Sequence, residues 1–298
     1  MWNAQHRDRV LAAALAAAIA VGLLGACSPG SSSPDADGVR VAAAAYPFAE
    51  AARWVGGGAV RVDDLTPPGT EPHDLEVTAD VADALLDADL GVVAGGAFQP
   101  ALEYAAARRD GPTLVAVEVP GIEGDDPHVW LDPVTMGAVV RATRDALLDV
   151  DGVDAASVRR GSRRALDRLR SLDAEYRVGL AQCDRRTLVT AHDAFGRLAA
   201  RYDLRVESIA GLSPEEEPEP RRLASLARLV RAEGITTVFT EELVSPRVAE
   251  VLARDAGVRT EVLSTIESLT PAQRRAGADY ESLMRRNLTR LREALGCD

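Results

Sequence analysis

Short apolar runs alternate with helical segments from residue 39 to about residue 120. Short buried runs bounded by turn residues predict strands, and the longer segments between them predict helices. The expected strands are residues 39–47, 59–67, 90–96 and 113–120, and the expected helices are residues 48–57, 78–90 and 98–109. Strands that alternate with helices are typical of a parallel sheet covered by helices.

Residues 133–181 follow a different pattern, because no strand-like run interrupts them. Asp151 and Gly152 mark the clearest break in this stretch. Beyond the break an apolar stripe recurs at spacings of three and four, which predicts one face of a long helix. The stripe consists of Leu166, Leu169, Leu172 and Tyr176. We expect residues 151–182 to form a stiff bridging helix.

The alternation of strands and helices restarts after this helix. The expected strands are residues 186–192, 204–212, 235–242 and 259–265, and the expected helices are residues 193–203, 221–234, 245–257 and 279–296. The sequence thus predicts an α/β protein with two lobes, residues 39–150 and 183–298, each a mostly parallel sheet flanked by helices, joined by one long rigid helix. Ligands of such proteins bind at the carboxyl ends of the strands and in the cleft between lobes.

The first 38 residues are unlike the rest of the chain. Residues 1–10 carry positive charge and lead into an apolar run that ends in Leu24-Gly25-Ala26-Cys27. That run is too short to span a bilayer comfortably and is typical of a secretory signal peptide, residues 1–26. Its end resembles the lipobox of bacterial lipoproteins, in which the cysteine is lipidated. Residues 27–38, rich in Ser, Pro, Gly and Asp, would then form a flexible tether.

This interpretation places the mature protein outside the cytoplasm, attached to the cell membrane by a lipid on Cys27. An ordinary signal peptide with an incidental cysteine is the alternative. In an oxidising compartment Cys183 and Cys297 could form a disulfide, and two free thiols are the alternative, because spacing alone does not show that they meet. The net charge of −12 without a basic run argues against a nucleic-acid partner. We expect a monomer.

Three of the four histidines lie at strand-to-helix junctions: His73, His128 and His192. A single histidine at such a place is more often structural than functional. Three, with two in the first lobe and one in the second, can close a cleft around one ion, and imidazole suits Zn²⁺. The neighbouring carboxylates could orient the rings or cap the helices that follow. They are Asp74, Asp126 and Asp193.

Several motifs resemble the cluster A-I metal-binding lipoproteins, the ZnuA/TroA-like zinc- and manganese-binding components of ABC importers. They are GTEPHDLEV, DPHVWLDP, VTAHDAFGRLAARYDL, GLSPEEEPEPRRLASL and VFTEELVSPRVAEVLARDAG. The resemblance covers residues 39 to about 297, and the three histidine motifs in this order are its most specific part. It implies two α/β lobes, one metal ion in the cleft between them, and delivery to an ABC permease driven by a cytoplasmic ATPase.

The resemblance assigns the first three metal ligands to His73, His128 and His192. Manganese-binding members commonly have a glutamate at the third position, so His192 favours Zn²⁺ over Mn²⁺. The fourth ligand is usually an aspartate after the last strand, where this chain has Ser264. A serine hydroxyl is a poor zinc ligand, so water or a nearby carboxylate is expected instead. Glu241 and Glu267 are the candidates, and we favour water or Glu241.

The expected function is therefore capture of Zn²⁺ outside the cytoplasm and transfer to an ABC importer, without enzymatic activity. A secreted zinc hydrolase or lyase is the main alternative, since three histidines with an open fourth position also hold catalytic zinc. The chain contains no HExxH and no GxSxG motif. A surface adhesin with the same fold is the third alternative.

Overall fold

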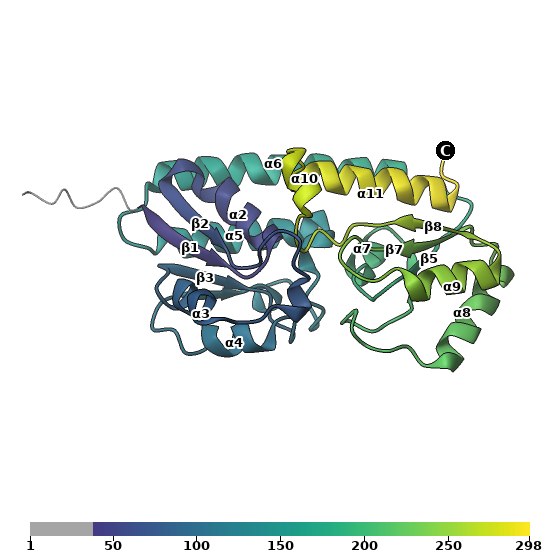
Figure 1. The fold of residues 1–298 in the computed structure, drawn as a ribbon. Coiled ribbons are helices and arrows are strands. Elements are labelled where there is room, and N and C mark those ends of the chain that lie inside the picture. Colours follow the sequence, from purple (N-terminus) through teal and green to yellow (C-terminus); the bar gives the residue numbers. More distant parts are fainter. Residues whose placement is uncertain (1–37) are drawn as a thin grey trace, which may run out of the picture. The chain divides into compact units, whose positions relative to one another are not determined.

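The structure, a computed structural model, describes residues 38–298 and contains two parallel sheets of four strands each. The first sheet has the order β2-β1-β3-β4 and the second the order β6-β5-β7-β8 (Figure 1). The strands of the first are β1 (Val39–Ala43), β2 (Val60–Asp64), β3 (Leu90–Val93) and β4 (Thr113–Val115). Those of the second are β5 (Thr187–Thr190), β6 (Arg205–Ser208), β7 (Thr237–Thr240) and β8 (Arg259–Val262).

Helices cover both faces of the first sheet. Along β1, Val41 and Ala43 belong to one hydrophobic cluster, and Ala42 belongs to another on the opposite face, as expected for side chains that alternate along a strand. The first cluster includes α2 (Tyr46–Gly56) and α5 (Pro133–Leu148), and the second includes α3 (Ala79–Leu86) and α4 (Pro100–Ala106). Short 3-10 turns connect these elements, namely η2 (Gly57–Ala59), η3 (Pro72–Asp74), η4 (Ala116–Glu118) and η5 (Val129–Leu131).

The second sheet is covered in the same way. Val189 of β5 and Val238 of β7 pack against α8 (Pro220–Ala232) and α9 (Arg247–Ala256). The opposite face belongs to the largest hydrophobic cluster, which also contains side chains of α7 (Gly196–Arg201) and α11 (Tyr280–Leu295). One further short helix, α10 (Pro271–Arg275), precedes α11. Because the largest cluster contains residues of both lobes, the two sheets share one core.

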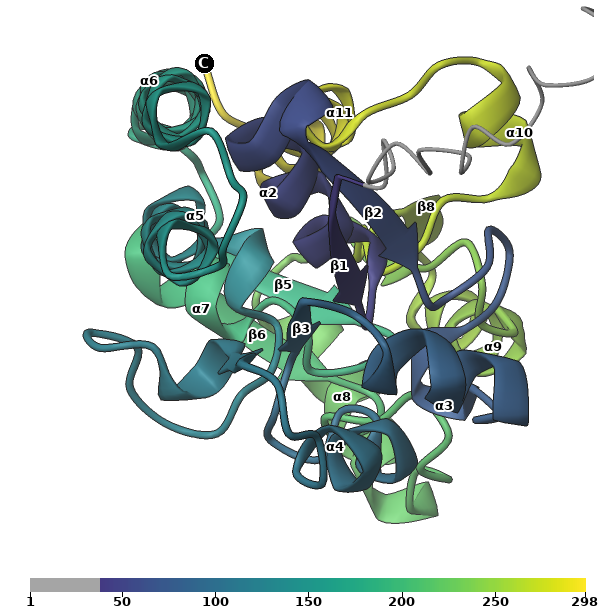
Figure 2. The same cartoon turned by 90° about the vertical axis from the view of Figure 1, so that its left-hand side faces the viewer.

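The long predicted helix is present as α6 (Ala155–Gly179). Asp154 caps its N-terminus, because the Asp154 carboxylate accepts a hydrogen bond from the backbone N–H of Ala156. The helix runs along both lobes, beside α2 and α5 in one and α11 in the other (Figures 1 and 2). Gly161 permits its close packing on α2, because a Cβ there would lie 2.3 Å from the carbonyl oxygen of Val55. Helix α6 therefore joins the two lobes rigidly, as the sequence predicted.

The predicted fold class is confirmed: two α/β lobes with parallel sheets, joined by a long helix. The expected signal peptide, the lipidated Cys27 and most of the tether lie outside the described residues. Within residues 38–298, no helix is both long and apolar enough to cross a membrane. This part of the chain is one compact unit that contains both sheets and all three hydrophobic clusters.

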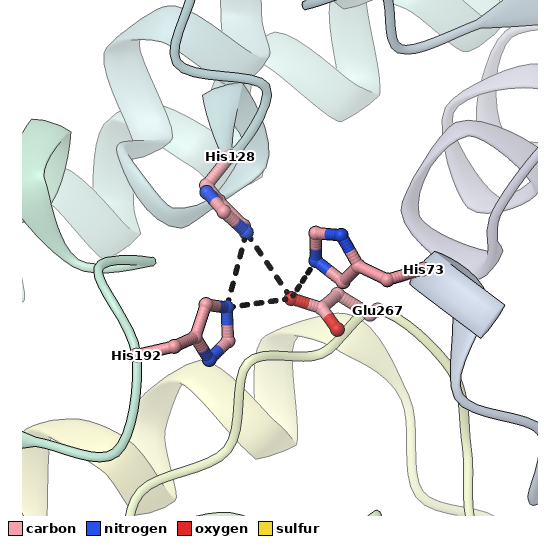
Figure 3. A group of neighbouring side chains, drawn as sticks. All are labelled: His73, His128, His192 and Glu267. Atoms are coloured by element: carbon pink, nitrogen blue, oxygen red, sulfur yellow. Dashed lines mark hydrogen bonds and ion pairs between the residues drawn. The ribbon is translucent and has the colours of Figure 1, made fainter. Parts of the chain in front are cut away.

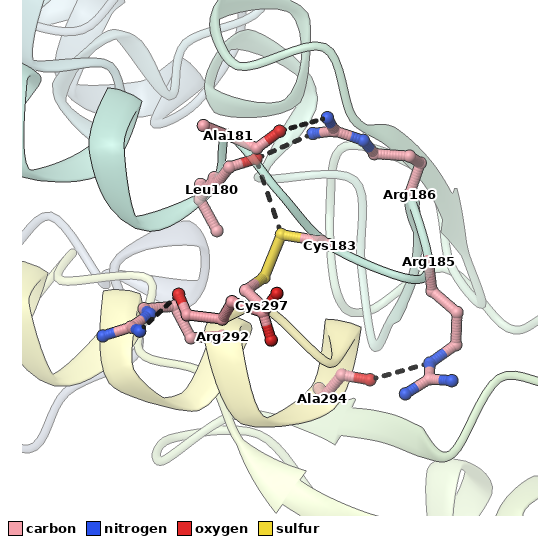
Figure 4. The surroundings of a disulfide bond; sticks show 9 residues. Leu180, Ala181, Cys183, Arg185, Arg186, Arg292, Ala294 and Cys297 are labelled. Atoms are coloured by element: carbon pink, nitrogen blue, oxygen red, sulfur yellow. Dashed lines mark hydrogen bonds between the residues drawn. A yellow bond between two sulfur atoms is a disulfide. The ribbon is translucent and has the colours of Figure 1, made fainter.

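The C-terminus is attached to the end of α6 by a disulfide between Cys183 and Cys297 (Figure 4). Backbone hydrogen bonds accompany it, from Asp184 N to Gly296 O at 3.1 Å and from Arg185 N to Leu295 O at 3.0 Å. The bridge closes a loop of 114 residues that contains the whole second sheet. It thus holds α11 beside α6 at the outer end of the second lobe.

We expect the Cys183→Ser/Cys297→Ser variant to lower the free energy of unfolding by about 2–5 kcal/mol, because a long cross-linked loop restricts the unfolded chain. Guanidinium denaturation without reductant measures this loss. Reductant should bring the parent protein close to the variant and leave the variant unchanged. Equal stability of parent and variant without reductant would contradict a stabilising bridge.

Candidate metal centre

Four side chains that can bind a metal converge between the two lobes (Figure 3). Each follows the carboxyl end of a strand: one in η3 after β2, one just before η5, one directly after β5, and one after β8. They are His73, His128, His192 and Glu267. The parallel order of both sheets sends these strand ends to the same region, which is where ligands of α/β proteins bind.

The ligand atoms of these side chains all lie within 4.8 Å of one another. Nε2 of His128 lies 3.3 Å from Nε2 of His192, and Oε1 of Glu267 lies 3.4 Å and 3.6 Å from these two nitrogens. Donors bound tetrahedrally to Zn²⁺ at about 2.0–2.2 Å are roughly 3.3–3.6 Å apart. Three of the four donors thus have the spacing of a tetrahedral zinc site. His73 Nε2 is slightly farther, at 4.0 Å from Oε1 of Glu267.

Two further carboxylates determine which ring nitrogens face the centre. Asp126 Oδ1 lies 2.9 Å from Nδ1 of His128, and both carboxylate oxygens of Glu241 lie 2.8 Å from Nδ1 of His192. An ionised carboxylate can only accept a hydrogen bond, so Nδ1 of each ring carries the proton. Nε2 of both rings then faces the centre, where it can bind a metal cation. Asp126 therefore orients a ring, one of its two predicted roles.

Glu267 is a fully buried carboxylate without a hydrogen bond among the described residues. Burial alone would raise its pKa, but His128 and His192 hold the pKa well below the usual range. Glu267 therefore stays ionised. An ionised carboxylate in a buried place is costly unless a cation or strong donors neutralise it. The pair Glu267 and Nε2 of His73, which is also unpartnered, thus indicates a cation site.

The imidazoles differ in their protonation. Burial lowers the pKa of His73 to about 4, so this ring is neutral at neutral pH. Burial also opposes protonation of His128, but Asp126 and Glu267 raise its pKa above 6.5. His192 behaves in the same way, with Glu241 as the main cause, and its pKa is raised well above 6.5. Contact with carboxylates thus favours protonation of His128 and His192, whereas burial disfavours protonation of His73.

Aromatic side chains enclose the centre on the side of the first lobe. The ring of Phe98 lies edge-on to His73 with centroids 4.4 Å apart, and Trp130 packs against His128 at 5.4 Å. Both aromatic residues are buried. They exclude water, which strengthens the interaction between the carboxylate and a bound cation.

Of the two candidate carboxylates for the fourth position, Glu267 and not Glu241 lies with the three histidines. Glu241 holds Nδ1 of His192 and is not one of the four converging ligands. The backbone of Ser264 is held by Asn287 of α11, with hydrogen bonds of 2.9 Å to its N–H and 2.7 Å to its C=O. Glu267, three residues after Ser264, is the carboxylate with an oxygen within 4.8 Å of the three imidazole nitrogens. A sequence signal existed, since Glu267 is an acidic residue in the loop that follows the last strand.

The loop that carries Glu267 is fixed by the first lobe. Trp130 donates its Nε1–H to the carbonyl of Thr265 at 2.7 Å, and the N–H of Tyr46 donates to the carbonyl of Glu267 at 3.2 Å. Between them Ile266 has a positive φ of 58°, which is rare for a β-branched residue. Such a conformation persists only where the surroundings enforce it. The loop is therefore held so that Glu267 points at the histidines.

Fold and centre together define a two-lobed binding protein with a metal site at the junction of its lobes. The family model described as zinc-uptake complex component A, periplasmic (ZnuA), matches residues 41–294. The chain therefore belongs to the ZnuA family, which confirms the resemblance found in the sequence.

Two curated relatives illustrate this membership. The zinc-binding lipoprotein AdcA of Streptococcus pneumoniae R6 is 34% identical over 286 residues, which cover 88% of this chain and 57% of AdcA. The high-affinity zinc uptake system protein ZnuA of Bacillus subtilis is 30% identical over a match of 299 aligned positions, gaps included; the match covers 92% of this chain and 94% of that protein. The chain thus spans less than two thirds of AdcA and nearly all of ZnuA.

Solved structures show the same fold. The Zn(II)-bound ZnuA-like domain of S. pneumoniae AdcA matches with a TM-score of 0.73 at 34% identity, over 87% of this chain and 99% of that one. The laminin-binding protein Lmb of Streptococcus agalactiae, described as an adhesin with metal-transporting activity, matches with a TM-score of 0.79 at 27% identity. That match covers 87% of this chain and 100% of that one.

The orienting role of Glu241 is testable. We expect Glu241→Ala to weaken zinc binding roughly 10- to 100-fold, the usual effect of removing a carboxylate that orients a metal-binding histidine. Competition titration with a zinc chelator measures the affinity. Glu242→Ala is the control, because Glu242 accepts a hydrogen bond from Gln273 instead of a histidine. An equal loss in both variants would show that Glu241 has no specific role.

Proposed function

We propose that this protein binds Zn²⁺ outside the cytoplasm and delivers it to an ABC importer. The observation that carries the proposal is the buried group of three imidazoles and one unpartnered carboxylate with all ligand atoms within 4.8 Å. We assign the four zinc ligands to His73, His128, His192 and Glu267. The names of the relatives AdcA and ZnuA, which refer to zinc binding and zinc uptake, support the assignment.

The donor set favours zinc over manganese. Imidazole is a good ligand for Zn²⁺, whereas Mn²⁺ prefers carboxylates and water in six-coordinate sites. Three nitrogens and one oxygen at nearly tetrahedral spacing leave little room for six ligands. The only charged group among the four ligands is the carboxylate of Glu267, and the two positive charges of Zn²⁺ would neutralise it.

The alternatives from the sequence are less well supported. A catalytic zinc site keeps an open coordination position for water or substrate, whereas Glu267 fills the fourth position here. We therefore do not favour a hydrolase or lyase. Lmb is described as having metal-transporting activity besides adhesion, so its similarity to this chain also agrees with metal uptake.

The partner we propose is the permease of an ABC importer, as in the zinc-uptake complex to which the family belongs. We further propose attachment to the outer side of the cytoplasmic membrane through a lipid on Cys27, as the name of the lipoprotein AdcA suggests. The protein would act as a monomer, with residues 27–38 as its tether. Its acidic charge does not favour nucleic acid.

Removal of single ligands tests the site. We expect the His73→Ala, His128→Ala, His192→Ala and Glu267→Ala variants each to bind zinc roughly 100-fold or more weakly, a loss of about 2.8 kcal/mol or more. Isothermal titration calorimetry measures the affinity. Ser264→Ala is the matched control in the same loop, and it should bind zinc like the parent protein. Unchanged affinity in any two ligand variants would refute the assignment.

The pH dependence of zinc binding follows from the raised pKa of His128 and of His192. Their protons must leave before zinc binds, so the affinity should fall as the pH drops through the raised pKa values and level off above them. With two protons displaced, the decline approaches roughly 100-fold per pH unit. Calorimetry in buffers of different ionisation enthalpy counts the released protons. A constant affinity between about pH 5.5 and 7.5 would contradict this prediction.

A further inference from the structure

Arg197, in the first turn of α7 in the second lobe, is hydrogen-bonded to the loop of the first lobe that carries His128. The guanidinium of Arg197 donates to the carbonyl oxygen of Asp126 from both Nε, at 3.0 Å, and Nη2, at 2.7 Å. Nη2 also donates to the carbonyl of Gly124 at 3.3 Å, and Nε lies 3.6 Å from the carboxylate of Asp126. Both side chains are mostly buried, with exposed fractions of 14% for Arg197 and 24% for Asp126.

Asp126 in turn contacts His128, one of the proposed metal ligands. Its Oδ1 accepts hydrogen bonds from the backbone N–H of His128 at 3.0 Å and from Nδ1 of the ring at 2.9 Å. The first of these is a local turn that fixes the backbone, and the second fixes the rotation of the imidazole. Arg197 thus holds the backbone of Asp126 by hydrogen bonds and its carboxylate by an ion pair, and the same carboxylate holds the ring of His128.

The position of Arg197 in the chain also links the two lobes. It lies five residues after His192, which is the ligand that the second lobe contributes at the end of β5. One short segment, residues 192–197, thus supplies a ligand of its own lobe and holds the loop of a ligand in the opposite lobe. A movement of the lobes relative to each other that displaces this segment would disturb both ligands together.

We propose that Arg197 is a positioning residue, which acts through Asp126 to hold His128 ready for zinc and so couples zinc binding to the contact between the lobes. This inference rests on the proposed function. Coupling is reciprocal: if the contact strengthens zinc binding, bound zinc strengthens the contact by the same free energy. An acceptor that pulls α7 from residues 124–126 would therefore promote the release of zinc.

A double-mutant cycle tests the proposal on the purified full chain, with the rate of zinc release to an excess of chelator as the measurement. We expect zinc to leave Arg197→Gln roughly tenfold faster and Asp126→Ala roughly 10- to 100-fold faster than the parent. If Arg197 acts through the Asp126 carboxylate, the double variant should release zinc no more than about twofold faster than Asp126→Ala alone.

The matched control is Arg186→Gln. Arg186 also donates to two backbone carbonyls, those of Leu180 and Ala181 at 2.9 and 3.1 Å, but lies near the disulfide and has no such connection to a metal ligand (Figure 4). Its loss should lower the melting temperature without changing zinc release. If Arg197→Gln does not fold, Arg197→Lys replaces it, because lysine keeps the charge and loses the two-pronged contact.

Two results would overturn the coupling: release from the folded Arg197 variant within about twofold of the parent, or a double variant whose acceleration equals the product of the two single effects. Either can occur in a protein that binds zinc tightly, so the proposed function would survive it. A parent protein that binds no zinc would instead refute the proposed function, and the inference with it.

Discussion

The structure depends on one electrostatic constraint, the negative charge of Glu267 in a fully buried place between two lobes. A carboxylate that has left water must be neutralised nearby. Here the groups around it are imidazoles from both lobes, whose Nε2 atoms can bind either a proton or a metal cation. The same charge that would destabilise the junction on its own therefore creates the affinity for metal, and it requires the lobes to stay together around the centre.

The scaffold supplies that proximity by rigid means. Helix α6 runs along both lobes, one hydrophobic cluster extends across them, and the disulfide fastens α11 beside α6. The site itself is assembled from loops at strand ends, which can move more easily than the sheets. Hydrogen bonds between the lobes compensate for this: Trp130 holds the loop of Glu267, and Arg197 holds the loop of His128. Rigid elements thus set the distance between the lobes, and polar contacts set the orientation of the ligands.

The orienting carboxylates explain how one centre can bind a cation tightly and still release it. Asp126 and Glu241 fix the tautomers so that Nε2 of both rings faces inward, where zinc and protons compete for the same atoms. Because Asp126 is itself held from the opposite lobe, the contact between lobes and the chemistry of the ligand are linked. A binding protein that must release its metal benefits from such a link, since a change in the contact changes the affinity.

Much of this protein was determined by local features of the sequence. Alternating apolar runs fixed the strands and helices, the stripe around Leu169 fixed α6, and three histidines at strand ends pointed to a metal. The sequence left water, Glu241 and Glu267 as candidates for the fourth ligand, because both carboxylates follow strands that end at the same edge of the second sheet. Only the tertiary structure separated them. In the structure Glu241 contacts Nδ1 of His192, on the side of the ring away from the centre, and Ser264 is hydrogen-bonded to Asn287. Ile266 has a left-handed backbone conformation, and Glu267, the next residue, points toward the histidines. Contacts from distant parts of the chain decide where a side chain in a loop points, so no local pattern could reveal it.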